Sequence, residues 1–128
     1  MRFLLDTHVF IWWAVDDPRL SARARVALAD AGNTVYLSAA SAWELALKVS
    51  LGKLALPDDP ANLISKAMIE EGMETLPITL HHALGLARLP LHHRDPFDRM
   101  LVAQAQLEGL PILSADPAFA AYDVEVIW

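Results

Sequence analysis

The sequence predicts an α/β domain whose mostly parallel sheet is assembled from βαβ units. Short apolar runs that suit buried strands alternate with helical stretches along the chain, which is the pattern of such units. The 128 residues suit one compact domain with one core, so we expect residues 1–128 to form a single domain. Apolar residues make up 55% of the chain and charged residues 20%, which is ample material for that core.

Five short apolar runs are predicted to be strands, because turn residues or the start of a helix bound each of them. In chain order they cover residues 2–5, 34–37, 75–78, 111–113 and 124–127. The first is entirely apolar after Arg2, as expected for a strand that is buried on both faces of a parallel sheet.

Helical segments fill the intervals between these strands. In chain order they begin at Thr7, cover residues 20–31, run from Ser38 to about residue 51, and cover 61–71, 79–89 and 95–109. Ser21 and Ser38 are suitable N-caps, since a serine hydroxyl accepts a hydrogen bond from a free backbone N–H group. Gly52, Gly72 and Gly109 are suitable helix ends, since glycine adopts a left-handed conformation without strain.

Composition excludes several classes of protein. The absence of cysteine rules out a disulfide framework, a zinc ribbon and a thiol nucleophile, and is compatible with the reducing cytoplasm, where we expect this protein. The apolar stretch at residues 3–15 is too short to cross a membrane and contains Asp6 and His8, so no membrane association is expected. A net charge of −6 has the wrong sign for a passive nucleic-acid binder with a broad basic face.

Four acidic residues are placed where the predicted fold brings strand ends together: Asp6, Glu44, Asp98 and Asp116. The carboxyl ends of parallel strands and the amino ends of the following helices share one edge of the sheet, and ligands bind there. Carboxylates gathered without a counter-ion repel one another, whereas a divalent cation turns the same arrangement into a cage of oxygen ligands. Mg²⁺ or Mn²⁺ is the expected ion. It could activate water and neutralise charge on a phosphodiester.

Taken singly, most of these acids have a structural alternative. Asp6 is a plausible N-cap, Asp95 and Asp98 bracket Pro96 like a capping pair, and Asp116 can start a turn. Glu44 lies in an apolar helix, where a solvated role explains it poorly. The joint placement of the acids at one edge is what favours a metal site.

The chain resembles a PIN-domain ribonuclease, and in particular the VapC toxins of type II toxin–antitoxin systems. The segments that carry the resemblance are LLDTHVFIW, SAWELALK with LGKL, HRDPFDRMLVAQA and LPILSAD, in family order and spacing over nearly the whole chain. The resemblance implies a three-layer α/β/α sandwich and a Mg²⁺- or Mn²⁺-dependent endoribonuclease. Its site residues would be Asp6, Glu44, Asp98 and Asp116, while Asp95 and Ser114 would either be ligands or hold the ligands in place.

The resemblance also implies partners, namely an RNA substrate, a cognate antitoxin whose tail occupies the active site, and a second copy of the chain in a homodimer. Basic and proton-accepting groups cluster beside the acids and could steer a phosphate backbone. They are His81, His82, Arg88, His92, His93, Arg94 and Arg99. Arg94 and Arg99 are the favoured RNA contacts, because the acids are their immediate neighbours, and the alternative for Arg99 is an ion pair with a carboxylate.

Two other functions are compatible with a doubly wound fold. A receiver-like signalling domain accepts a phosphoryl group, but it needs a lysine late in the chain, and the lysines here are Lys48, Lys53 and Lys66. A non-catalytic module that binds RNA or protein would not need the complete set of acids.

Overall fold

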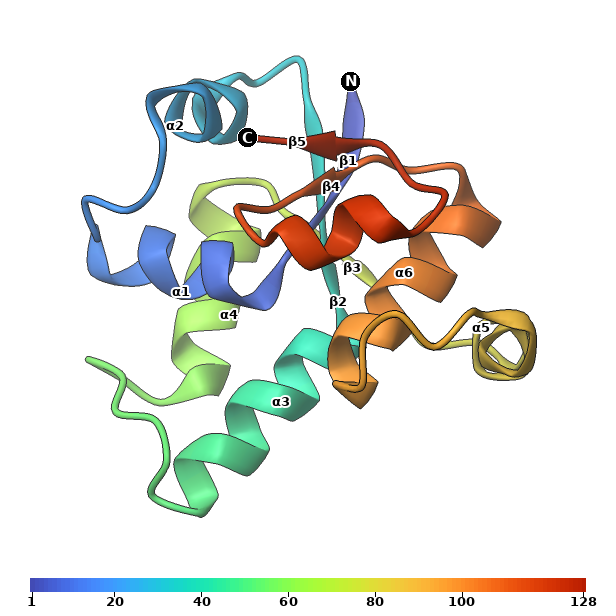
Figure 1. Ribbon diagram of the computed structural model, residues 1–128. Coiled ribbons are helices and arrows are strands. Elements are labelled where there is room, and N and C mark those ends of the chain that lie inside the picture. The colour runs from blue at the N-terminus through green and yellow to red at the C-terminus, as the bar shows by residue number, and fades with distance from the viewer.

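A five-stranded sheet lies between two layers of helices (Figure 1) in the computed structural model, which describes residues 1–128. The strands are β1 (Arg2–Leu5), β2 (Thr34–Ser38), β3 (Glu74–Leu76), β4 (Ile112–Leu113) and β5 (Val126–Ile127). Their order across the sheet is β3-β2-β1-β4-β5, and every neighbouring pair is parallel. The predicted α/β/α sandwich with a mostly parallel sheet is therefore confirmed.

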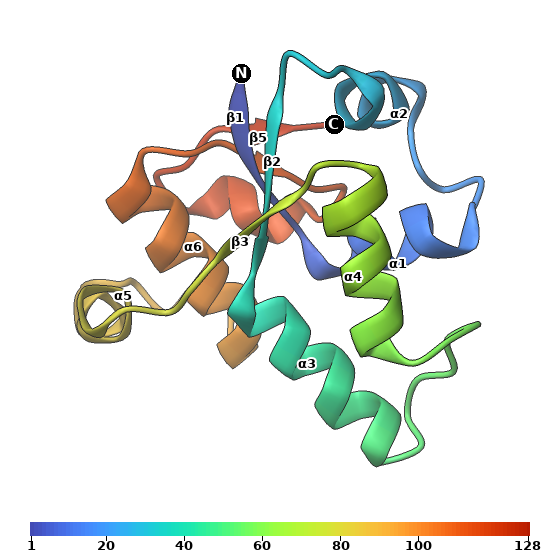
Figure 2. The ribbon, with the colours of Figure 1, turned by 180° about the vertical axis from the view of Figure 1, so that it is seen from behind.

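The helices divide between the two faces of the sheet, and Figure 2 shows the same division from behind. They are α1 (Thr7–Val15), α2 (Ala22–Ala29), α3 (Ala39–Ser50), α4 (Pro60–Glu70), α5 (Leu80–Gly85) and α6 (Pro96–Glu108), with 3₁₀ helices η1 (Leu86–Arg88) and η2 (Pro117–Ala121). Helices α1, α2 and α4 cover one face, and α6 and η2 cover the other. No helix combines the length and the hydrophobicity that crossing a membrane requires.

Local side-chain chemistry explains most of the helix boundaries. Ser21 and Ser38 accept hydrogen bonds from backbone N–H groups at the starts of α2 and α3, as predicted. Gly52, Gly72 and Gly109 have φ of 68°, 68° and 65°, the left-handed conformation that favours glycine after a helix.

Several predicted elements differ from the structure. The strand predicted at residues 75–78 is β3 (Glu74–Leu76), and the strand predicted at residues 124–127 is the two-residue β5 (Val126–Ile127). Helix α2 is shorter than residues 20–31, because its cap at Ser21 places the first helical residue at Ala22. The segment 79–89 divides into α5 and the 3₁₀ helix η1. Helix η2 was not predicted, since the sequence signals only a turn where Asp116 precedes Pro117.

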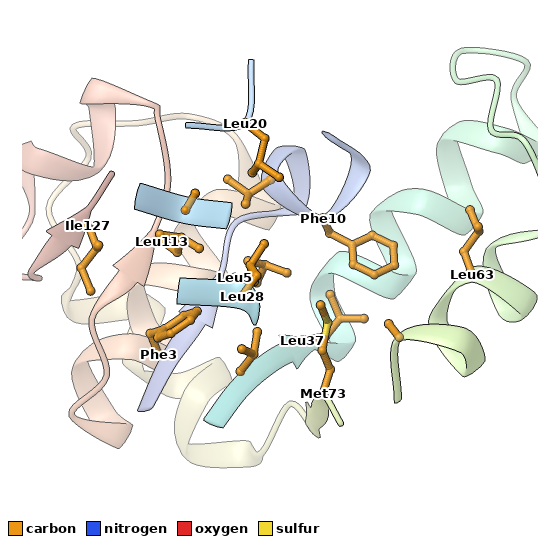
Figure 3. Close-up of a cluster of buried hydrophobic side chains, with 14 of the residues drawn as sticks. Phe3, Leu5, Phe10, Leu20, Leu28, Leu37, Leu63, Met73, Leu113 and Ile127 are labelled. Atoms are coloured by element: carbon orange, nitrogen blue, oxygen red, sulfur yellow. The ribbon is translucent and has the colours of Figure 1, made fainter. Parts of the chain in front are cut away.

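Alternate residues of the central strands enter two separate cores. Phe3 and Leu5 of β1 pack with Leu113 of β4 in the core beneath α1, α2 and α4 (Figure 3). Leu4 of β1 and Ile112 of β4 point to the opposite face and pack in the core beneath α6 and η2. These residues have no exposed surface, as expected where helices cover both faces of a parallel sheet.

Truncating a core leucine of the short strand β4 should be costly. We expect Leu113→Ala to lower the free energy of unfolding by about 2–5 kcal/mol, because it removes buried surface and leaves a cavity. The matched control is Leu107→Ala at a side chain that is 54% exposed, where the change should be within about 0.5 kcal/mol. Chemical denaturation measures both, and equal losses would contradict the assignment of Leu113 to the core.

Candidate functional site

Two of the predicted acids follow neighbouring central strands. Asp6 comes directly after β1 and caps α1, and Asp116 follows β4 and caps η2. Connections leave β1 toward β2 on one side and enter β4 on the other, so this edge is the topological switch of the sheet. Ser114 links the two acids, because its hydroxyl donates to Asp6 Oδ2 at 2.7 Å and accepts from the backbone N–H of Asp116 at 3.0 Å.

Glu44 reaches the site from α3 and is only 3% exposed. Its Oε2 atom accepts a hydrogen bond from Lys48 Nζ at 2.6 Å, one helical turn further on. Its Oε1 atom is buried and has no hydrogen-bond partner. The contact with Glu44 raises the pKa of Lys48, and the charges of Asp95 and Asp98 act in the same direction. A buried carboxylate oxygen without a partner is rare in folded proteins, and such an oxygen is suited to bind a cation.

Asp98 lies in the first turn of α6 and is 7% exposed. Burial and, after it, the negative charges of Asp6, Asp95 and Glu44 raise the pKa of its carboxyl group to about 7, whereas His93 opposes them. Such mutual influence requires these side chains to lie near one another. The structure therefore brings Asp6, Glu44 and Asp98 together, although they are far apart in the sequence.

His93 completes the group, although the sequence placed it only among the residues that could steer a phosphate backbone. Its Nε2 atom lies 2.9 Å from Asp98 Oδ2 and 3.9 Å from Asp116 Oδ2. His93 joins Asp116 to the cluster around Asp98, so all four predicted acids belong to one site. His92 is an adjacent residue of the same type, so the sequence contained no signal that would select His93.

A common pattern relates the four acids. Each carboxylate has at least one oxygen next to a polar group of the protein: Ser114 donates to Asp6, Lys48 to Glu44 and the Ala118 N–H group to Asp116, and His93 Nε2 lies 2.9 Å from Asp98 Oδ2. Asp6 also accepts on its other oxygen, from the N–H group of His8. On Glu44 the second oxygen is buried and unpartnered. The set thus contains a buried oxygen with a free lone pair, on Glu44, and a carboxyl group that resists ionisation, on Asp98. Such oxygen ligands fit a hard divalent cation.

Asp95 and Ser114 lie beside these acids and hold the local backbone. Asp95 Oδ1 accepts hydrogen bonds from the N–H groups of Phe97 and Asp98, at 2.9 and 3.0 Å, and so caps α6. The cap fixes the orientation of the turn that carries Asp98. Ser114 orients the side chain of Asp6 through its hydrogen bond to Oδ2.

The two predicted RNA contacts have different surroundings. Arg94 is exposed in the loop before α6. Arg99 has another role from the one predicted, because its guanidinium donates to backbone carbonyl groups of the preceding loop, the closest being that of Pro90 at 2.9 Å. The other acceptors are the carbonyl groups of Leu86, Leu89 and His93 and the hydroxyl of Tyr122. Arg99 therefore fastens the loop instead of facing a substrate.

A cleft of 260 Å³ opens beside Glu44, between α1 and α3. Its walls combine apolar and basic side chains, namely Thr7, His8, Ile11, Trp12, Arg19, Glu44, Leu45, Lys48, Lys53 and Leu54. Arg19 is paired with Asp17 at 2.8 Å and Lys48 with Glu44, whereas Lys53 forms no ion pair. The carboxylate of Asp6, 3.8 Å from His8 Nδ1, raises the pKa of His8, which strengthens the positive character of this wall.

Comparison with known proteins agrees with this architecture. The family model described as "PIN domain" matches residues 3–125. Ribonuclease VapC16 of Mycobacterium tuberculosis is 41% identical over 70 residues, which make up 52% of this chain and 48% of that protein. The match thus spans about half the length of this curated relative.

Solved structures match over almost the full chain. The structure of VapBC-5, a member of the VapBC family of toxin–antitoxin systems from Mycobacterium tuberculosis, is 27% identical, with a TM-score of 0.62 over 98% of this chain and 97% of that chain. VapBC2 from Rickettsia felis, bound to a promoter DNA fragment, is 16% identical and has a TM-score of 0.72 over 99% and 98% of the two chains, which is a likeness of fold. From the family match over residues 3–125, the chain belongs to the PIN-domain family.

Proposed function

We propose that residues 1–128 form a single nuclease domain, a divalent-metal-dependent endoribonuclease that hydrolyses RNA phosphodiester bonds and acts as the toxin of a toxin–antitoxin pair. The observation that carries the proposal is the unpartnered Oε1 atom of Glu44, which is buried in the cluster of acids that includes Asp98. The named ribonuclease relative and the toxin–antitoxin complexes of the same fold support this assignment.

Mg²⁺ or Mn²⁺ is the ion that we propose for the site, with Asp6, Glu44, Asp98 and Asp116 as its ligands. Their oxygen atoms suit hard cations, and the excess of negative charge in a buried place favours a double positive charge. When bound, such an ion supplies positive charge to the phosphodiester and acidifies water for in-line attack.

The neighbouring residues prepare the acids for this role. Ser114 holds Asp6 in one orientation through a hydrogen bond of 2.7 Å, and Asp95 orients the first turn of α6. Lys48 offsets the charge of Glu44 while the second oxygen of that carboxylate stays free. These contacts reduce the reorganisation that binding of an ion would otherwise require.

Contacts with RNA are proposed on both sides of the acids. Arg94 is exposed in the loop that leads into α6, and Lys53 lines the cleft beside Glu44. Both are cations without an ion pair, so each can meet a backbone phosphate.

Two protein partners belong to the same proposal. A cognate antitoxin with a basic tail would complement the acidic site, since opposite charges favour association. A second copy of the chain could cover the apolar side chains that α3 exposes, which are Trp43, Leu47 and Leu51. They are spaced by four residues and therefore lie on one face of the helix.

Removing one acid should abolish cleavage without unfolding the protein. We expect Asp98→Asn to lower the rate of Mg²⁺-dependent RNA cleavage by at least about 100-fold, as when one electrostatic element of a catalytic site is lost. Asp123→Asn, at an exposed acid outside the site, is the control and should cleave like the wild type. Cleavage of a labelled RNA measures both variants. An Asp98→Asn variant of full activity would refute the proposed site.

The acidic cluster should also give the metal-free protein an unusual dependence of stability on pH. The pKa of Asp98 is about 7 in the folded protein, against an ordinary value of 3.8, so the folded state binds more protons between these pH values. The free energy of unfolding without metal therefore contains a term that falls as the pH rises from about 4 to about 7 and stays low above that range.

Asp98→Asn removes this term. The variant should be more stable than the wild type by about 1–3 kcal/mol near pH 8, with a smaller difference near pH 4. Denaturation in the presence of a chelator, at a series of pH values, measures the effect. A difference that is constant with pH would contradict the raised pKa of Asp98.

The toxin role has its own test in cells. Expression of the wild-type chain should arrest growth of a bacterial host, because hydrolysis of cellular RNA stops protein synthesis, and Asp6→Asn should relieve the arrest at equal protein level. An arrest that persists in Asp6→Asn would argue against RNA cleavage as its cause.

A further inference from the structure

The imidazole of His93 lies between two of the acids at the switch point of the sheet. Its Nε2 atom is 2.9 Å from Asp98 Oδ2 and 3.9 Å from Asp116 Oδ2, and its side chain is 23% exposed. The nearest ligand-type atoms of His93, Asp98 and Asp116 all lie within 4.8 Å of one another, so distance alone would allow all three to bind one ion. The hydrogen bonds of the imidazole decide whether His93 belongs to that set.

The backbone around His93 is held from two directions. The His93 N–H group donates to the hydroxyl of Tyr122 at 2.8 Å, and the His93 carbonyl group accepts from Arg99 at 3.4 Å. Arg99 also holds the carbonyl groups of Leu89 and Pro90, at 3.3 and 2.9 Å. This set of contacts gives the imidazole one defined position next to the carboxylates.

The second ring nitrogen fixes the tautomer. His93 Nδ1 accepts a hydrogen bond from the backbone N–H of Asp95 at 3.2 Å, so it carries no hydrogen atom of its own. In a neutral imidazole the hydrogen atom then lies on Nε2, the ring atom that is 2.9 Å from Asp98 Oδ2. A nitrogen that carries hydrogen has no lone pair to offer to a metal ion.

We propose that His93 is a positioning residue of the metal site, whose Nε2–H group holds one oxygen of Asp98 and leaves the other for the cation, and that the imidazole is not a ligand. This inference rests on the proposed function, since it assumes that the acids bind a divalent ion. In this proposal His93 orients the carboxylate of Asp98, as Ser114 orients the carboxylate of Asp6.

Metal affinity tests the inference without reference to cleavage. Calorimetric titration with Mn²⁺ and with Zn²⁺ should show that His93→Ala weakens both ions by a similar factor, about 10- to 100-fold, as for other residues that orient a ligand. His93→Gln should recover most of the loss, because the glutamine amide can donate in place of Nε2–H. His81→Ala, at an exposed histidine of α5, is the control and should bind like the wild type.

The outcomes are distinct. A loss that is much larger for Zn²⁺ and is not recovered by glutamine would make His93 a ligand and overturn the inference, because imidazole favours zinc. Unchanged binding in His93→Ala would also overturn it while the proposed function stands. A wild-type protein that binds neither ion would overturn the proposed function itself.

A second measurement needs no variant. Nitrogen-15 spectra of the histidine side chains distinguish the two tautomers, and we expect hydrogen on Nε2 of His93 in the Mg²⁺-loaded wild-type protein. Hydrogen on Nδ1, with a bare Nε2, would overturn the inference even if His93→Ala fails to fold.

Discussion

Repulsion among buried carboxylates is the constraint on which the arrangement of this protein depends. Asp6, Glu44 and Asp98 are each less than a tenth exposed, and burial together with the charges of the neighbouring acids raises the pKa of Asp98 to about 7. The protein offsets this repulsion with a polar partner for at least one oxygen of each, and these partners come from the β4 end, from α3 and from the loop before α6. The site therefore exists only once the sheet and both helical layers are assembled.

Helix capping and the site use the same residues. Asp6 caps α1 with Oδ1 and meets Ser114 with Oδ2, and Asp116 caps η2 with Oδ1 while Oδ2 faces His93. A capping aspartate is thus no alternative to a site aspartate, because a carboxylate has two oxygen atoms. The parallel sheet makes the combination possible, since strand ends and helix starts meet at one edge.

Local patterns in the sequence were sufficient for the order of strands and helices, because caps such as Ser38 and glycines such as Gly109 act within one turn of the chain. They were insufficient where the outcome depends on distant groups. Arg99 follows Asp98 directly, yet successive side chains on a helix point about 100° apart, so Arg99 faces the loop instead of the site. His93 acquires its position through Tyr122, which lies 29 residues further on, and through Arg99.

The attachment of the loop between η1 and α6 has a consequence for how this protein can diversify. The guanidinium of Arg99 donates its hydrogen bonds to that loop almost entirely to main-chain carbonyl groups, which every amino acid possesses. The exposed positions Arg88, at the end of η1, and Leu91 can consequently be exchanged while the path of the loop is retained. New recognition properties can arise there by substitution, independently of the acids that the loop adjoins.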